Sequence, residues 1–330
     1  MKILNKSLKI KDMELKNRLV MPPMATEQSE DGVVTQRLLD YYDEKTKGGY
    51  IGLVITEHAF IRQDGKAGKG QLSISRDSDV EGLKKLVDVI HNNGSKVIAQ
   101  MNHAGSATNP ELSGYKGKSA SAVVNPRFPG EEYGIPEEMS TEDIVGIVQA
   151  FADAARRAKA AGFDGVEIHS AHGYLLNQFY SPLTNKRTDA YGGDVEGRVR
   201  IHLDIIKAVR EAVGDDMIVA LRLGASDYME GGNTVEDGAK AVVLFESAGL
   251  DLIDISGGFN GFRREDTKAA GYFGDAAQAV KASVSIPVIL TGGVRDAQSA
   301  DQLLVEGKAD LIGVGRAIYK DSDWAKKQML

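Results

Sequence analysis

The stretch GVEIHSAHGYLLNQF at residues 165–179 contains the unit from which the fold is built. It starts as a short apolar run and continues into a segment with the character of a helix start. In the apolar run, Val166 and Ile168 alternate with Glu167 and His169, so the two pairs are expected on opposite faces of a strand. The pattern predicts a buried strand that ends in polar side chains and leads into a helix.

Seven further apolar, β-branched runs occur along the chain. Eight such strands alternating with helices predict an α/β fold, a single (β/α)8 TIM barrel over residues 1–330. The alternative is an open doubly wound sheet, but its usual G-x-G-x-x-G turn after the first strand is missing. The seven runs are RLVMPPM (18–24), IGLVITEH (51–58), KVIAQMNH (96–103), MIVALRLG (217–224), LIDISG (252–257), IPVILTGG (286–293) and LIGVGR (311–316).

Segments with helical period lie between most of these runs. Ser140, with Asp143 three residues later, is typical of a capped helix start. Residues 105–140 are too long for a simple loop and are rich in Gly, Pro, Ser and Asn, so they are expected to form a cap over the barrel mouth after the third strand. The apolar faces of two helices are Leu83, Leu86, Val87 and Ile90, and Ile144, Val148, Phe151 and Ala155.

Composition excludes several classes of function. The net charge is −7 and no basic stripe is present, so nucleic acid is not an expected partner. The chain has no cysteine, which excludes disulfides, thiolate nucleophiles, zinc–thiolate sites and cysteine-ligated iron–sulfur clusters. The N-terminus lacks the apolar run of a signal peptide, and no stretch has the length of a membrane span. A cytoplasmic protein with no membrane partner is expected.

Polar side chains stand at the carboxyl ends of seven of the eight predicted strands. In a barrel these ends converge on one mouth, where active sites are found. Their convergence predicts a functional site. The residues are Thr56, Glu57, His58, Gln100, His103, His169, His172, Arg222, Ser256, Thr291 and Arg316.

The last two predicted strands end in glycine-bearing turns. One contributes Gly292 and Gly293, and the other contributes Gly313, Gly315 and Arg316. Loops after the seventh and eighth strands form the common phosphate site of barrels, because backbone N–H groups face the anion and glycine allows close approach. An arginine adds a bidentate contact. The alternative is that these glycines only permit tight turns.

Gln100 and Arg222 are expected to point into the mouth from the third and fifth strands. Glutamine donates and accepts hydrogen bonds at once, which suits a ring with adjacent N–H and C=O groups, and arginine stabilises negative charge on such a ring. With a phosphate site opposite, they favour a phosphorylated heterocycle such as FMN. His169 and His172, with Glu167 nearby, also suit two metal ligands, but no third ligand is evident and no metal is expected.

The chain resembles, nearly end to end, the old yellow enzyme family of FMN-dependent ene-reductases (NADH:flavin oxidoreductases). It is also similar to the barrel domain of 2,4-dienoyl-CoA reductase, without the iron–sulfur and second nucleotide-binding regions. The most specific block is AGFDGVEIHSAHGYLLNQFYSPLTNKRTDAYGG (161–193). The other segments are LKNRLVMPPM (15–24), QMNHAG (100–105), LRLGASD (221–227), LIDISGG (252–258) and ADLIGVGR (309–316).

The resemblance implies non-covalent FMN at the barrel mouth and NADH or NADPH as the reductant. It implies that His169 and His172 bind the activating oxygen of the substrate, that Tyr174 is the proton donor, and that Glu27 and Tyr272 lie at the substrate. Ala25 stands where relatives often have Thr or Cys, and Ser106 replaces an Arg of some relatives. The residues implied at FMN are Pro22, Pro23, Met24, Ala25, His58, Gln100, Arg222, Ser256, Gly257, Gly292, Gly293, Gly315 and Arg316.

The reaction implied by the resemblance moves a hydride from NAD(P)H to FMN and then from flavin N5 to the β carbon of an activated alkene, with protonation by Tyr174. Alternatives are a flavin oxidoreductase or oxidase with another electron acceptor, a flavin-binding protein without activity, and a phosphate-binding barrel lyase or isomerase. A Schiff-base aldolase needs a strand-end lysine, and no strand end has one. The substrate is expected to be a small molecule. Its identity, the preferred nicotinamide and a homo-oligomeric state stay open.

Overall fold

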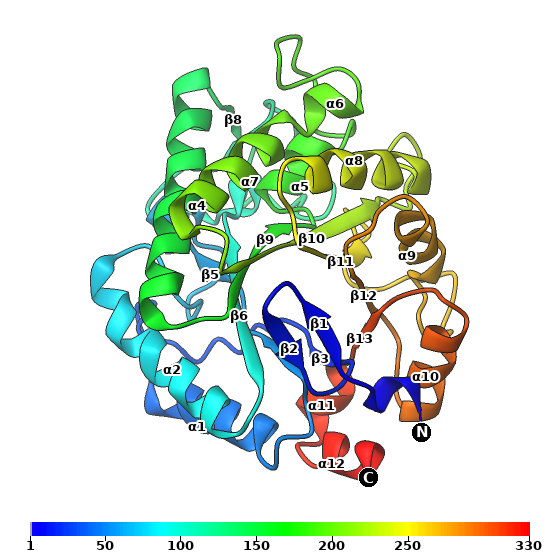
Figure 1. Ribbon diagram of the computed structural model, residues 1–330. Helices are drawn as coiled ribbons and strands as arrows, with labels where there is room; N and C mark the ends of the chain where they lie inside the picture. The colour runs from blue at the N-terminus through cyan, green and yellow to red at the C-terminus, as the bar shows by residue number, and fades with distance from the viewer. Residues whose placement is uncertain (1) are drawn as a thin grey trace.

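Eight parallel strands close on themselves to form a barrel (Figure 1). The computed structural model describes residues 2–330. Strand β4 pairs with β3 on one side and with β6 on the other, and this second pairing closes the sheet. The predicted TIM barrel is therefore confirmed, with one strand from each of the eight predicted runs. The strands are β3 (Leu19–Met21), β4 (Leu53–Ile55), β6 (Lys96–Asn102), β9 (Gly165–Ser170), β10 (Ile218–Ser226), β11 (Leu252–Gly257), β12 (Val288–Thr291) and β13 (Leu311–Gly313).

Helices surround the barrel on its outside (Figure 1). The predicted cap of α4 is present: the Ser140 side chain accepts from the Asp143 backbone N–H, and the Asp143 side chain accepts in return from the Ser140 N–H. No helix within residues 2–330 is long and apolar enough to cross a membrane. The main helices are α1 (Gln36–Thr46), α2 (Val80–Asn92), α4 (Thr141–Ala161), α7 (Arg200–Val213), α8 (Val235–Ser247), α9 (Gly274–Lys281), α10 (Ala297–Val305), α11 (Arg316–Lys320) and α12 (Trp324–Met329).

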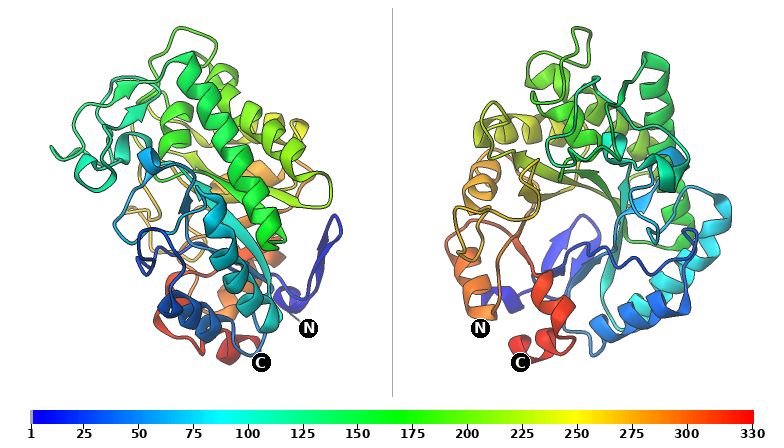
Figure 2. Two further views of the ribbon diagram at one scale, coloured as in Figure 1. Left: turned by 90° about the vertical axis from the view of Figure 1, so that its left-hand side faces the viewer. Right: turned by 180° about the vertical axis from the view of Figure 1, so that it is seen from behind.

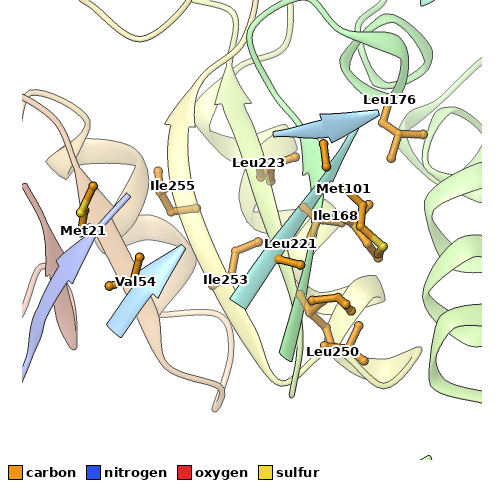
Figure 3. Packing of buried hydrophobic residues seen from close by; sticks show 14 of the residues in the cluster. Met21, Val54, Met101, Ile168, Leu176, Leu221, Leu223, Leu250, Ile253 and Ile255 are labelled. Carbon is orange, nitrogen blue, oxygen red and sulfur yellow. The ribbon is translucent and has the colours of Figure 1, made fainter. Parts of the chain in front are cut away.

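Alternation along each strand divides the core into two parts. Ile253 and Ile255 of β11 face outward and belong to the large apolar cluster between barrel and helices (Figure 3). Leu252 of the same strand faces inward and belongs to a second, smaller cluster. Successive side chains of a strand point to opposite faces, so every second residue lines the barrel interior.

A short hairpin closes the amino-terminal end of the barrel. Its strands β1 (Leu8–Ile10) and β2 (Met13–Leu15) are antiparallel and lie across the barrel opening in Figure 1. Met13 and Leu15 are buried in the inner cluster, together with Leu53 of β4 and Leu252 of β11. The sequence analysis did not predict this hairpin, because each of its strands contains only two apolar residues. Because the hairpin covers the amino-terminal end of the barrel, the open mouth is at the carboxyl-terminal end.

Residues 105–140 form an excursion with little regular structure, visible beside the barrel in Figure 2. It contains helix α3 (Pro110–Ser113) and the two-residue strands β7 (Lys118–Ser119) and β8 (Glu137–Glu138), which pair in parallel. The Arg187 guanidinium donates to the carbonyls of Ala120 at 3.0 Å and Met139 at 2.7 Å. One buried side chain thus holds two separate points of the excursion against the body of the protein.

Replacement of Leu15 by alanine tests whether the hairpin is part of the core. Leu15 is fully buried against the barrel interior. We expect Leu15→Ala to lower the free energy of unfolding by about 2–5 kcal/mol, measured by urea titration. Glu14→Ala in the same strand, where the side chain is exposed, is the matched control. Equal stability of the two variants would show that the hairpin is dispensable.

Candidate active site

A cavity of about 760 Å³ opens at the carboxyl ends of the barrel strands. Its volume lies within the range of small-molecule and cofactor sites. Most of the residues predicted from the sequence line it, from eight different strand ends and the loops after them. These are Pro22, Pro23, Met24, Ala25, His58, Gln100, His169, His172, Tyr174, Arg222, Ser256, Tyr272, Gly292, Gly293, Gly315 and Arg316.

Two of the residues predicted at the cofactor or the substrate lie outside the lining. Glu27 is not in the lining, and its carboxylate accepts from the backbone N–H of Gly70 at 2.6 Å, so the predicted substrate contact of Glu27 stays a prediction. Gly257 was predicted at the cofactor, but its carbonyl instead accepts from the backbone N–H of His172 at 3.3 Å. Its position supports the histidine from outside the cavity.

Several lining residues were missed by the sequence analysis. Arg127 and Phe128 come from the excursion, where no periodic pattern indicates which side chains turn inward. Arg295 and Lys320 follow the two glycine turns, and their nearness to those turns is a signal that could have found them. Val294 and Ala317 complete this group.

A strained turn positions His172. Its φ is 61° and that of Gly173 is 76°, so two successive residues lie in the left-handed region, which is rare for a histidine. The Asn177 side chain holds the turn by accepting from the Gly173 N–H at 2.7 Å. Because of this turn, the chain leaves β9 and places His169, His172 and Tyr174 at the same part of the cavity.

The surroundings of the two histidines favour their neutral forms. Burial lowers the pKa of both His169 and His172 well below the usual value, and the nearby Arg222 lowers them further. His172 Nε2 lies 2.8 Å from Ser256 Oγ, and Nδ1 of His169 is buried without a partner among the described residues. Neutral imidazole still has one N–H group, so each ring can donate a hydrogen bond to a ligand oxygen.

Tyr174 lies within a group of aromatic rings. Its ring stacks on His58 with centroids 5.4 Å apart and on Phe128 at 6.1 Å, and it meets His169 edge-on at 5.2 Å. Burial raises the pKa of Tyr174 to about 12, although Arg127 opposes this shift. The phenol therefore keeps its proton at neutral pH and can act as an acid.

Beneath the cavity, a layer of polar side chains crosses the barrel interior. Gln100 Nε2 donates to Glu167 Oε2 at 2.7 Å, and Arg222 Nε lies 3.3 Å from Asp254 Oδ2. Burial and repulsion by Asp254 raise the pKa of Glu167 to about 8, and burial also raises the pKa of Asp254. Thr291 donates to Asp254 Oδ1 at 3.2 Å. The two predicted ring-binding residues are thus both oriented by buried acids, which the sequence analysis did not identify as a layer.

Ala25 lies in the cavity lining, and its methyl side chain cannot form a hydrogen bond with a ligand. The neighbouring Thr26 does not replace it, because its hydroxyl and its backbone N–H both donate to Glu57 Oε2, at 2.7 and 2.6 Å. Burial raises the pKa of Glu57 to about 7 despite these bonds. Thr26 therefore faces the second strand end rather than the ligand.

The opposite end of the cavity suits an anion. Gly292 has φ 156° and Gly293 φ 70°, and a Cβ on Gly293 would lie 2.7 Å from the carbonyl oxygen of Ala269. Arg316 donates to the Tyr272 hydroxyl at 3.1 Å, and α11 begins at Arg316. Tight glycine backbone and cationic side chains at a helix start fit a phosphate group.

The arrangement fits a flavin mononucleotide. The buried Nε of Arg222 makes no hydrogen bond within residues 2–330, although it is close to Asp254, and it faces a cavity that also contains Gln100. A ring with alternating donors and acceptors would match these two side chains, and a phosphate would match the glycine turns. Within the same residues, no group of three potential ligands is placed to hold a metal ion.

Comparison with known proteins shows clear relatives. The NADH:flavin oxidoreductase / NADH oxidase family matches residues 4–329. The chain is 39% identical to an NADH oxidase of Thermoanaerobacter brockii over 97% of this chain and 49% of that protein. It is 36% identical to a metal reductase of Desulforamulus reducens over 100% of this chain and 49% of that protein. The chain therefore spans about half the length of these curated relatives.

Two solved structures share the fold over nearly the whole chain. One is 2-naphthoyl-CoA reductase with 2-naphthoyl-CoA, with TM-score 0.88 and 29% identity, covering 99% of this chain and 52% of that one. The other is an old yellow enzyme homologue from Zymomonas mobilis, with TM-score 0.86 and 25% identity, covering 98% of this chain and 91% of that one.

The raised pKa of Glu167 predicts a pH-dependent stability. Between its ordinary value near 4.5 and about 8, the folded protein keeps a proton that the unfolded chain has released. Rising pH therefore lowers the free energy of unfolding, by up to about 1.4 kcal/mol per pH unit. Glu167→Gln cannot ionise, so its stability relative to wild type should improve from pH 5 to pH 8.

Urea titrations at both pH values measure this difference. Glu142→Gln, on the exposed first turn of α4, is the control and should show no such trend. A difference between Glu167→Gln and wild type that stays constant with pH would show that Glu167 is ionised in the folded protein throughout this range.

Proposed function

Because the chain belongs to the NADH:flavin oxidoreductase / NADH oxidase family, we propose that it is an FMN-dependent ene-reductase that uses NADH or NADPH. The observation that carries the proposal is the convergence of His169, His172 and Tyr174 on the cavity that also contains Gln100 and Arg222. A protein that only stored flavin would need the last two residues and not the first three.

The cavity residues divide between cofactor and substrate. Gln100 and Arg222 would hold the pyrimidine ring of FMN, and Pro22 to Ala25 would line one edge and face. The turns after β12 and β13, with Arg316, would take the phosphate. When bound, FMN supplies the hydride chemistry between the nicotinamide and the alkene.

The substrate oxygen would lie between His169 and His172, whose ring centroids are 5.1 Å apart. Negative charge develops on this oxygen as the alkene is reduced, and neutral N–H donors in a buried site stabilise it. Tyr174, whose ring lies edge-on to His169 at 5.2 Å, would give its proton to the α carbon. Together these residues orient the alkene and supply the proton, while the walls of the cavity exclude water.

A second candidate is reduction of a different electron acceptor. The names of the two sequence relatives, an NADH oxidase and a metal reductase, favour it. NADH oxidation measured anaerobically with 2-cyclohexenone, with ferric iron or with neither, and then again in the presence of dioxygen, distinguishes the two functions. Stimulation by the enone supports the ene-reductase, and oxidation that needs dioxygen or ferric iron and ignores the enone supports the alternative.

Gly293→Ala tests the proposed phosphate site. The added Cβ meets a backbone oxygen at 2.7 Å in a left-handed residue, so the turn must shift. We expect at least about tenfold weaker FMN binding, equivalent to about 1.4 kcal/mol, in fluorescence titrations of the apoprotein. Gly307→Ala is the matched control, because Gly307 has the same φ of 70° and no atom near its added Cβ. Equal FMN affinity of the two variants would place the phosphate elsewhere.

Tyr174→Phe tests the proton donor. We expect alkene reduction to slow by about 10²–10⁴-fold in stopped-flow experiments, because the general acid is removed. Reduction of bound flavin by NADH, which needs no proton from this residue, should be unchanged. Tyr180→Phe, at the far end of α5 and outside the cavity lining, is the control. Equal losses in both half-reactions would contradict the assignment.

A further inference from the structure

Arg127 enters the cavity from the excursion and has no anionic partner there. Its side chain is partly buried, and no acceptor within residues 2–330 forms a hydrogen bond or ion pair with its guanidinium. Burial lowers the pKa of Arg127 from its usual value. A guanidinium removed from water without a counter-charge is unfavourable unless a ligand provides one.

The other unpaired arginines of the described chain differ from Arg127 in burial. Arg37, Arg263 and Arg295 are exposed, so water solvates their charges. Buried and partly buried arginines elsewhere each have a hydrogen-bond acceptor or an ion-pair partner: Arg198 donates to three carbonyl oxygens, and Arg187 pairs with Asp189. Arg127 is therefore an exception that the folded chain does not explain by itself.

The backbone at Arg127 is held firmly. Asn125 Oδ1 accepts from the Arg127 N–H at 3.0 Å, and Asn125 Nδ2 donates to Ser106 Oγ and to the Gly173 carbonyl, both at 2.9 Å. Asn125 thus connects the excursion to the turn that carries His172 and Tyr174. The arginine has a fixed position relative to the proposed catalytic residues.

Two glycines give the arginine side chain room. A Cβ on Gly173 would lie 3.2 Å from Arg127 Cβ, and a Cβ on Gly261 would overlap the guanidinium. The guanidinium packs on two aromatic faces, 5.7 Å from the Phe128 centroid and 5.6 Å from that of Phe262. Phe128 in turn stacks on Tyr174. The cation therefore lies at the end of the ring stack, one ring beyond the proton donor.

We propose that Arg127 binds a carboxylate of the substrate, and that the substrate class is an activated alkene with an acid group separate from its activating oxygen. This inference rests on the proposed function. A single planar guanidinium flanked by aromatic rings suits a monoanion in bidentate contact. The phosphate end of the cavity has its own cations, Arg295, Arg316 and Lys320, so Arg127 is not needed there.

Ligand binding to the FMN-loaded protein tests the proposal. The probes are 4-hydroxybenzoate and its uncharged methyl ester, titrated by the change in flavin absorbance. Wild type should bind the acid more tightly than the ester. Arg127→Gln should weaken binding of the acid by about 10–100-fold and leave the ester unchanged, because a partly buried charge pair is lost.

Arg263→Gln is the matched control. Arg263 packs on the same Phe262 ring at 5.3 Å, but it is exposed and outside the lining, so acid binding should be unchanged. Equal weakening of acid and ester by Arg127→Gln would overturn the proposal, as would an equal effect of Arg263→Gln. A raised KM for NADH in Arg127→Gln with unchanged acid binding would also overturn it and assign the arginine to the nicotinamide dinucleotide.

Turnover of 2-cyclohexenone, a neutral enone, separates this inference from the proposed function. Wild type and the control variant Arg263→Gln should reduce it at similar rates. Failure of wild type to reduce it would count against the ene-reductase, while the absorbance titrations would still decide whether Arg127 binds a carboxylate.

Discussion

The pairing of β4 with β6 is the contact on which the site depends. It closes the sheet, so that each of the eight barrel strands has a neighbour on both sides and their ends surround one mouth. Register then fixes which side chains meet: Gln100 lies opposite Glu167, and Arg222 lies opposite both His169 and Asp254. A slip of one residue in any of these strands would exchange the ligand-facing residues for apolar ones of the outer core.

The polar layer under the mouth is unfavourable for folding but useful for binding. Two carboxyl groups and one guanidinium are buried together. Burial raises the pKa of Glu167 and of Asp254, and repulsion by Asp254 raises that of Glu167 further. Arg222 attracts Asp254 on one side and faces the cavity on the other. An electron-rich ring above it would use a positive charge that is already oriented, so no reorganisation is needed when negative charge develops there.

Strand periodicity made most of the fold and of the cavity floor predictable. His169 lies one residue before the end of β9, and Arg222 lies between Leu221 and Leu223 of β10. The alternating pattern of these strands assigns both side chains to the interior. Asp254, between Ile253 and Ile255, follows the same alternation, so its place in the polar layer could also have been predicted. Of that layer, the sequence analysis predicted only Gln100 and Arg222 as ring-binding residues. The hairpin at residues 8–15 was missed because its strands are too short to show a period.

The positions of side chains in loops could not be predicted from periodicity, for a physical reason. Three hydrogen bonds of the Asn125 side chain hold the backbone at Arg127, and the Glu27 carboxylate accepts a hydrogen bond from the Gly70 N–H. Such bonds join residues far apart in sequence and follow no period, so only coordinates reveal them. The groups proposed for the chemistry therefore stand on regular strands and the turn after β9, whereas the group proposed to select the substrate stands on the excursion. Change in the excursion can alter the ligand without disturbing the register that holds the catalytic groups.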